Sequence, residues 1–141
     1  MLNVPVKNIM QTENALLLPP ATSVVDAAVQ MAARHVGAVM VVEQGELLGI
    51  FTERDLMCRV VAKGLDPKVI QIADVMTRHP RTVASEKSYG HALIIMQENH
   101  FRHLPVVDDG KLMGIISARN AMDPDLEEFV AETNRRVAMR E

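Results

Sequence analysis

The sequence predicts a mixed α/β (α+β) fold made of two pseudo-symmetric β-α-β-β-α units packed against each other, with a helix after them. The first observation is an internal repeat. Ser23–Asp55 aligns with Ser88–Asn120 without gaps, and 11 of the 33 pairs are identical. The second is that strand-like and helix-like segments follow the same order in both copies. The third is the length of 141 residues with 48% hydrophobic residues, which suits one compact domain.

The repeat divides the chain into three parts. We expect residues 1–66 to form the first unit with an N-terminal segment, residues 67–122 to form the second unit, and residues 123–141 to form the final helix. The segments Val6–Met10 and Ile72–Met76 also resemble each other, with the shift between copies changed by one position. Two copies are too few for a solenoid, which favours two half-domains.

The first unit begins with a short strand and a helix. Leu16–Leu18 is apolar and is followed by two prolines, which predicts a strand that ends there. Ser23, with Asp26 three residues later, resembles a capping box, so we expect a helix to begin at this point. Apolar residues at helical spacing supply its apolar face: Val25, Ala28, Val29 and Ala32.

A hairpin and a second helix complete the first unit. Ala38–Val42 and Leu47–Phe51 are apolar runs separated by residues 43–46, which predicts a hairpin. Thr52 opens a helix that we expect to end at Gly64. The second unit repeats this order: a strand at Thr82–Ala84, a helix from Ser88, strands at Leu104–Val107 and Leu112–Ile116 around the turn Asp108-Asp109-Gly110, and a helix from Ser117.

The last segment predicts one more helix. Asp123, Pro124 and Asp125 combine a cap residue, a proline at the first helical position and acidic side chains in the first turn. An apolar stripe follows: Leu126, Phe129, Val130 and Val137. Three arginines lie near the favourable C-terminal end: Arg135, Arg136 and Arg140. The sequence leaves open whether this helix packs on the two units or on a second subunit.

Composition excludes several classes of partner. Aromatic residues make up 3% of the chain, which argues against a stacking platform for single-stranded nucleic acid. The net charge of −3 gives no general attraction to phosphate backbones, so we expect no nucleic-acid partner. We expect neither a signal peptide nor a membrane span, because no apolar run fits either. With Cys58 as its single cysteine, the protein is predicted to be cytoplasmic.

The main candidate site is the junction between a hairpin and the following helix, which occurs in both units. Gly49–Asp55 and Gly114–Asn120 share a glycine, two apolar residues, a hydroxyl residue and an arginine. In one interpretation, Thr52 or Ser117 simply caps the helix. In the other, the hydroxyl and the free N–H groups bind phosphate, and the carboxylate of Asp55 binds sugar hydroxyls. Recurrence of the whole pattern favours the ligand site.

These duplicated motifs resemble a tandem pair of cystathionine-β-synthase-type (CBS) domains. The resemblance extends from about Val6 to Met122 and includes Val75–Thr77, Pro80–Val83 and Arg102–Asp108. It implies two units packed sheet to sheet, often assembled as homodimers in a flat disc. It also implies two clefts between the units that bind an adenosine-containing ligand, such as AMP, ADP, ATP, NAD or S-adenosylmethionine.

The resemblance assigns seven residues to the first cleft. Asp55 would bind the ribose hydroxyls, Thr52 would bind phosphate or ribose, and Ile50 would line the adenine. The second unit would add His103, Pro105 and Arg119, with Arg81 near the rim. The arginines and the histidine suit the several phosphates of NAD, and AMP is equally consistent with the sequence.

The resemblance assigns six residues to the second cleft: Ala38, Met40, Arg54, Ile115, Ser117 and Asn120. Asn120 departs from the aspartate that the family more often has, and an amide is a poorer partner for two hydroxyls. Gly37 and Ala38 stand where the second unit has Arg102 and His103, so only the first cleft receives a histidine from across the interface. We therefore expect the Asp55 cleft to bind better and the second cleft to be weak or empty.

Other chemistry is not favoured by the sequence. His100 and His103 lack acidic or cysteine ligands at zinc spacing, so we expect no metal site. Nothing resembles a nucleophile elbow or a P-loop, so we expect no enzymatic activity. The favoured hypothesis is a regulatory or sensor module, homodimeric, that signals through a conformational change or an effector protein. The alternative is a structural dimerisation or interaction module whose ligand sites are vestigial.

Overall fold

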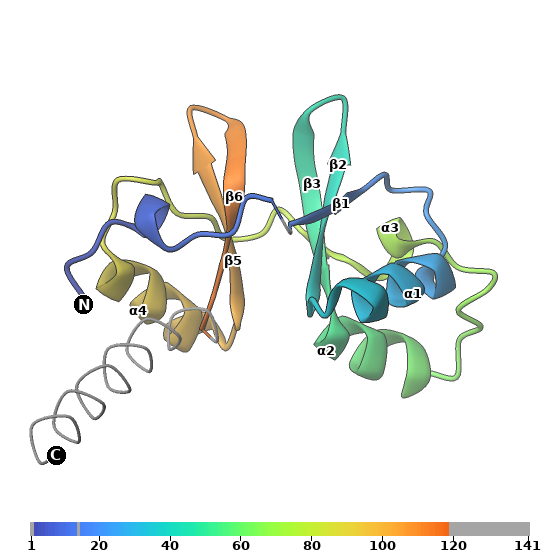
Figure 1. Ribbon diagram of the computed structural model, residues 1–141. Helices are drawn as coiled ribbons and strands as arrows, with labels where there is room; N and C mark the ends of the chain where they lie inside the picture. The colour runs from blue at the N-terminus through green and yellow to red at the C-terminus, as the bar shows by residue number, and fades with distance from the viewer. Residues whose placement is uncertain (1, 14, 119–141) are drawn as a thin grey trace, which may run out of the picture.

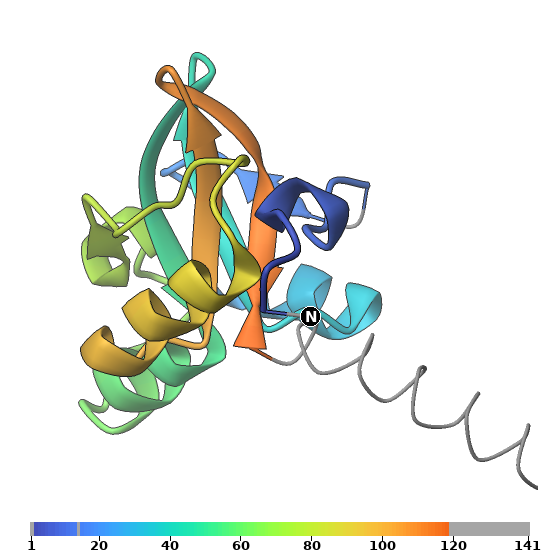
Figure 2. The same ribbon diagram turned by 90° about the vertical axis from the view of Figure 1, so that its left-hand side faces the viewer.

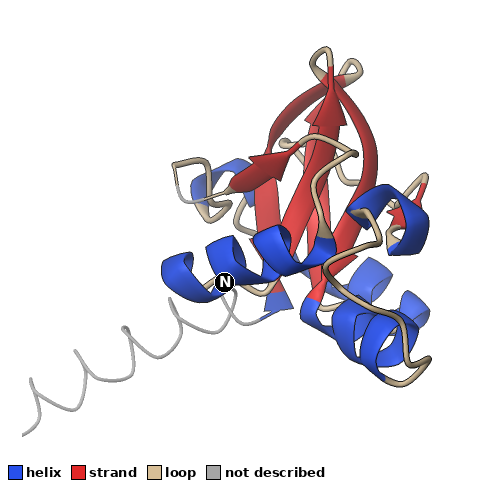
Figure 3. Cartoon of the chain, turned by 90° about the vertical axis from the view of Figure 1, so that its right-hand side faces the viewer, coloured by secondary structure: helices blue, strands red, loops and turns tan. Residues whose placement is uncertain are grey.

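The computed structural model describes residues 2–13 and 15–118. The helix predicted at residues 123–141 and, beyond residue 118, the helix predicted from Ser117 therefore lie outside the described residues. Two units stand side by side, and each presents a β-hairpin toward the other (Figure 1). The strands form the middle of the molecule and the helices lie around them (Figure 3). The mixed α+β architecture predicted from the repeat is confirmed.

The first unit contains a four-stranded sheet and one regular helix. Its elements are β1 (Leu16–Leu18), α1 (Val24–Arg34), β2 (Ala38–Glu43) and β3 (Glu46–Thr52), and β4 (Thr77–Arg78) joins from later in the chain. The strand order is β1-β2-β3-β4, with β1 parallel to β2 and the other pairs antiparallel. Ser23 Oγ accepts a hydrogen bond from the Asp26 N–H at 3.1 Å, which confirms the predicted start of α1. The helix buries Val24, Ala27 and Met31, so the apolar face predicted from the sequence is not the one that enters the core.

The second helix of the first unit is irregular. A single turn, α2 (Glu53–Asp55), continues into a π-helix, η2 (Leu56–Val61). The chain turns at Gly64, which has a φ of +69°, so the helix ends close to the predicted position. The wider π-helical turn was not predicted, because apolar periodicity does not distinguish it from an α-helix.

The second unit follows the same order with a smaller sheet. Its elements are α4 (Tyr89–Asn99), capped by Ser88, and the hairpin of β5 (His103–Asp108) and β6 (Lys111–Ser117). The two hairpin turns lie at the same end of the molecule (Figure 2). Within the ranges given above, no helix has the length and apolar character needed to cross a membrane.

The strand predicted at Thr82–Ala84 is reduced to a single bridge from Val83 to β5, which corrects the prediction. The Val83 N–H donates to the Pro105 carbonyl at 3.0 Å. The ladder does not extend toward the start of the segment, because Pro105 has no N–H to donate. It does not extend the other way, because the Ser85 N–H donates to the Asp108 carboxylate instead, at 2.9 Å.

Each unit completes its core with a short segment that lies directly before the other unit in the sequence. The N-terminal 3₁₀ turn Val6–Asn8 packs on the second unit, where Val6 shares a core with Tyr89 (Figure 1). Helix α3 (Ile72–Val75) packs on the first unit, where Ile72 is fully buried. The cores therefore combine residues from both sides of the boundary expected near residue 66.

The two units pack through the faces of their hairpins. Val39 and Val41 contribute to the core of the first unit, while Met40, between them, faces the opposite way. Met40 and Ile50 form a buried apolar cluster with Ile115 of the second unit. This cluster is the sheet-to-sheet contact that the resemblance implied.

Val6→Ala is expected to lower the free energy of unfolding by about 2 kcal/mol, because it removes two buried methyl groups and leaves a cavity in the second unit. Urea denaturation followed by circular dichroism measures the loss. Leu17→Ala is the control, since Leu17 is 47% exposed, and it should cost less than half as much. Equal losses in the two variants would show that the N-terminal segment does not contribute to the core.

Candidate functional site

Two cavities are lined by residues of both units. The first, here called the Asp55 cavity, has a volume of about 790 Å³. It is lined by Ile50, Thr52 and Asp55 of the first unit and by Arg81 and His103 of the second. The structure therefore brings together five of the seven residues expected in the first cleft. The volume lies in the range of cavities that hold small molecules.

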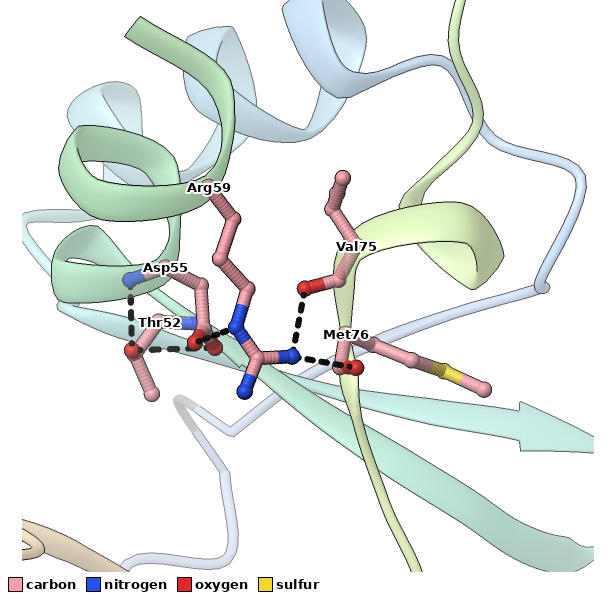
Figure 4. Close-up of polar contacts among 5 residues, drawn as sticks. All are labelled: Thr52, Asp55, Arg59, Val75 and Met76. Carbon is pink, nitrogen blue, oxygen red and sulfur yellow. Dashed lines mark hydrogen bonds and ion pairs between the residues drawn. The ribbon is translucent and has the colours of Figure 1, made fainter. Parts of the chain in front are cut away.

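A reciprocal capping box fixes the position of Asp55. Its backbone N–H donates to Thr52 Oγ1 at 3.2 Å, and its Oδ2 accepts from the Thr52 N–H at 3.0 Å and from the Thr52 hydroxyl at 3.2 Å (Figure 4). Asp55 is only 8% exposed. The two interpretations of the junction are therefore compatible, because Oδ2 caps the helix and leaves Oδ1 for other contacts.

Arg59 lies beside this second carboxylate oxygen. Its Nε is 3.6 Å from Asp55 Oδ1, and its Nη1 donates to the main-chain carbonyls of Met76 and Val75 at 3.0 and 3.3 Å (Figure 4). Arg59 was not predicted from the sequence as a residue of this site. The available signal was its spacing, since an arginine four positions after an aspartate lies on the same helix face.

Positive side chains outnumber negative ones around the Asp55 cavity. The acidic residues are Asp55 and Glu53, whereas four arginines line it: Arg54, Arg59, Arg81 and Arg102. Guanidinium groups bind phosphate oxygens, and a carboxylate accepts hydrogen bonds from neighbouring hydroxyls. The arrangement therefore suits an anionic ligand that also carries hydroxyl groups. The cavity is also lined by residues that were not predicted from the sequence as part of this site: Met57, Thr77, Pro80, Asn99, His100 and Phe101.

The second cavity, here called the Ser117 cavity, has a volume of about 910 Å³. Four residues expected in the second cleft line it: Ala38, Met40, Ile115 and Ser117. The structure does not place Arg54 there, because Arg54 lines the Asp55 cavity. The reason is the direction of the short helix α2, in which the Glu53 N–H donates to the Gly37 carbonyl at 2.9 Å and the next residue turns away from the Ser117 cavity.

Glu53, Arg102 and His103 line both cavities and form a shared wall. Gly37 lies against this wall. A Cβ atom at Gly37 would be 3.1 Å from Glu53 Oε1 and 3.3 Å from His103 Cε1. The absence of a side chain at Gly37 therefore gives room to the histidine of the second unit.

Three other sequence-predicted positions are placed as follows. Pro105 is buried in β5 and lines neither cavity. Arg119 and Asn120 lie outside the described residues. Cys58 is exposed and lines the Asp55 cavity, near which its spacing from Asp55 placed it.

The two histidines that the sequence analysis considered as metal ligands, His100 and His103, both line the Asp55 cavity. In the part of the chain that the structure describes, no group of three or more histidine, cysteine, aspartate or glutamate residues could hold a metal ion. Glu53 and Arg102 are the charged residues that act on the His103 imidazole.

Burial lowers the pKa of His103 below its ordinary value of 6.5. The nearby Glu53 carboxylate opposes this shift in pKa, and the Arg102 guanidinium adds to it. The folded protein therefore favours the neutral imidazole. Because the unfolded chain binds more protons just below pH 6.5, the free energy of unfolding falls as the pH drops from about 6.5 through the lowered pKa.

His103→Gln is expected to reduce the acid dependence of stability. Urea unfolding at a series of pH values from about 7 to 5 should give a shallower decline for the variant than for the wild type, because the group whose pKa differs between the two states is gone. His91→Gln is the control, since His91 is exposed and lines neither cavity. Identical pH profiles for wild type and His103→Gln would contradict the prediction.

Two units of the same order that pack through their hairpins and share two cavities define a duplicated module suited to a ligand between its halves. Comparison with protein families agrees with this class. A model of the CBS domain family matches residues 6–62 and again residues 72–124. The chain belongs to the CBS domain family and carries a tandem pair of these domains, as its motifs indicated.

Known proteins show the same relationship. The CBS domain-containing protein CBSCBSPB3 of Arabidopsis thaliana is 40% identical over 108 residues, which are 76% of this chain and 19% of that protein. The chain thus spans about a fifth of the length of this relative. An uncharacterized conserved protein from Pyrococcus horikoshii superposes with a TM-score of 0.83 at 29% identity, covering 89% of this chain and 94% of that one. CBSX2, crystallised with AMP, has a TM-score of 0.74 at 29% identity and covers 88% and 97%.

Proposed function

We propose that this chain is a regulatory module that binds an adenosine-containing ligand, such as AMP, ADP, ATP or NAD, in the Asp55 cavity. The observation that carries the proposal is the convergence of Asp55 and Thr52 with Arg81 and His103 on one cavity of about 790 Å³. The complex of CBSX2 with AMP supports it, since that protein has the same fold at 29% identity.

Each group in the Asp55 cavity suits one part of such a ligand. Asp55 Oδ1 accepts hydrogen bonds from the ribose hydroxyls, because Oδ2 is engaged by Thr52. Ile50 offers an apolar surface to the adenine. Arg54 and Arg81 supply positive charge for phosphate oxygens. Pro105 and Arg119 remain assigned to this site by resemblance alone.

In this proposal the Ser117 cavity is the weaker site. Ser117 and Asn120 stand where the first unit has Thr52 and Asp55. An amide offers one acceptor oxygen, whereas a carboxylate offers two and carries a charge. A ligand that depends on hydrogen bonds from two sugar hydroxyls therefore fills the Asp55 cavity at lower concentrations.

A ligand in the Asp55 cavity regulates the module through the arrangement of its two units. It contacts the first unit at Asp55 and the second at His103, so its binding energy depends on the position of the two units relative to each other. The ligand shifts the balance between two arrangements only by its difference in affinity for them. The output then passes to a protein effector or to a second subunit.

The experiment that tests the proposal is mass spectrometry of small molecules released from freshly purified protein. Isothermal titration calorimetry with AMP, ADP, ATP and NAD follows, and we expect at least one adenosine ligand to bind with a stoichiometry of one per chain at low concentration. Absence of binding by all four at millimolar concentration, in protein freed of bound ligand, would overturn the proposal. Analysis of the nucleotides after incubation should show no turnover, as expected for a module that is not an enzyme.

A structural dimerisation module with vestigial sites is the second candidate. Large apolar side chains on the helices favour an apolar contact with a second subunit, with 55–69% of each exposed: Val29, Met57, Val61 and Ile94. Light scattering after gel filtration should show a dimer in either candidate, and Val61→Glu should weaken it. A dimer that binds no adenosine ligand would favour the structural module.

We also propose that the protein acts in the cytoplasm, where the exposed thiol of Cys58 stays reduced.

A further inference from the structure

The guanidinium of Arg59 joins two walls of the Asp55 cavity. On one side its Nε lies 3.6 Å from Asp55 Oδ1, and on the other its Nη1 donates to the carbonyls of Met76 and Val75 at 3.0 and 3.3 Å (Figure 4). A nitrogen-to-oxygen distance of 3.0 Å is that of a direct hydrogen bond, so Arg59 is bound to the main chain at the end of α3. The contact with Asp55 is a longer ion pair.

The segment that Arg59 holds leads from the first repeat to the second. After Met76 it forms β4, in which Thr77 pairs with Ile50 of β3. Both Thr77 and Ile50 line the Asp55 cavity, and the chain then continues to Arg81, which lines it too. Any change in the position of this segment therefore changes the cavity and the connection between the two units.

The geometry of Asp55 leaves Oδ1 able to serve a ligand and Arg59 together. Thr52 engages Oδ2, and the separation of 3.6 Å between Oδ1 and the guanidinium is too long to use up an acceptor position on Oδ1. Hydrogen bonds from two ligand hydroxyls to this oxygen draw on the same negative charge that attracts Arg59. A change in the hydrogen bonding of Asp55 therefore changes its attraction for the Arg59 guanidinium. The guanidinium in turn contacts the main chain at Met76.

We propose that Arg59 is a positioning residue that couples ligand engagement at Asp55 to the segment at residues 75–78. This inference rests on the proposed function, since it concerns the same cavity. Ligand binding at Asp55 steadies Arg59, and Arg59 steadies the end of α3 and the β3–β4 pairing. The signal reaches the connection between the repeats without any ligand contact to Val75 or Met76.

Arg78 offers a matched control. It is an arginine whose Nη2 donates to the Ala73 carbonyl of the same helix α3 at 3.3 Å. It differs from Arg59 in having no ion pair with Asp55, and it does not line the Asp55 cavity. Arg78→Met therefore removes a similar bond to the same segment while leaving the link to Asp55 intact.

The test combines AMP affinity with hydrogen exchange in the full chain. Arg59→Met should weaken AMP binding by about 5- to 30-fold, since a charge-assisted contact is lost on both walls, and Arg78→Met should change it by about twofold or less. In wild type and in Arg78→Met, AMP should slow amide exchange at Asp55 and also at residues 76–78. In Arg59→Met at saturating AMP, slowing should persist at Asp55 and disappear at residues 76–78. Equal slowing in all three proteins would overturn the proposal.

A second measurement separates this proposal from the proposed function. Without ligand, exchange rates at residues 76–78 are compared in wild type, Asp55→Asn, Arg59→Met and the double variant. Coupling predicts that the two single effects are non-additive by about threefold or more. Additive effects would overturn the coupling even if AMP binds. Non-additive effects in a protein that binds no adenosine ligand would keep the coupling and reject the proposed ligand.

Discussion

Asp55→Asn is expected to remove most of the AMP-dependent rise in the Tm of this protein. Hydrogen bonds to a charged acceptor contribute about 1.5–3 kcal/mol, so the loss of charge at Oδ1 should weaken AMP binding by about 10- to 100-fold. At an AMP concentration of about 100 times the wild-type Kd, ligand stabilisation should fall from about 2.7 to about 0.4–1.4 kcal/mol. Differential scanning calorimetry across a series of AMP concentrations measures this loss.

Asp74→Asn is the matched control for Asp55→Asn. Asp74 holds the same capping position in α3, where its Oδ2 accepts from the Gln71 N–H at 3.0 Å, and it lines neither cavity. Both variants should lower the Tm of the free protein slightly, because both weaken a helix cap. Only Asp74→Asn should retain the full AMP shift. A full shift in Asp55→Asn would show that the ligand does not depend on this carboxylate.

Gly49→Ala and Gly114→Ala are each expected to destabilise the protein strongly, because the added methyl group would collide with main-chain atoms. A Cβ atom at Gly49 would lie 2.6 Å from Met76 Sδ and 2.7 Å from the Thr77 carbonyl oxygen, and one at Gly114 would lie 2.7 Å from the Gln11 carbonyl oxygen. Since main-chain oxygens cannot rotate away, the neighbouring segments must move apart. We expect a loss of about 2–3 kcal/mol for each variant, seen as a fall in Tm of about 10 °C.

Gly45→Asn is the control for the two glycine variants. Gly45 lies in the hairpin turn with a φ of +79° and has no atom within 4 Å of its Cβ position. Asparagine tolerates this left-handed conformation, so the change in Tm should be small. Wild-type stability in both Gly49→Ala and Gly114→Ala would mean that the neighbouring segments are not held this closely.

Local sequence signals predicted most of the regular structure. Ser23 and Ser88 cap the two regular helices because a hydroxyl next to the first turn satisfies an otherwise unpaired N–H. The hairpins follow from pairs of continuous apolar runs around glycine-containing turns. The strand at Thr82–Ala84 was wrongly extended, since the limits set by Pro105 and Asp108 lie in another part of the chain.

The candidate site was predictable at positions where the two copies share the same residues. It was not predictable where the placement of a residue depends on the three-dimensional fold. Thr52 and Asp55 were found because the pattern recurs in the second unit. The placement of Arg54 depends on the direction of a single helical turn, which spacing does not reveal. The carbonyl partners of Arg59 are main-chain atoms, which carry no mark in the sequence.

The crossed placement of the two short segments also sets the order in which the protein matures during synthesis. Lys7 is synthesised before both units, yet its ion-pair partner Glu86 is 79 positions further along the chain. The first core has all its parts once Met76 has been made, whereas the N-terminal segment waits for the second hairpin. Contacts that span so much chain form slowly. The segment around Val6 precedes both units in the chain, yet it is among the last parts of the two units to reach its native place.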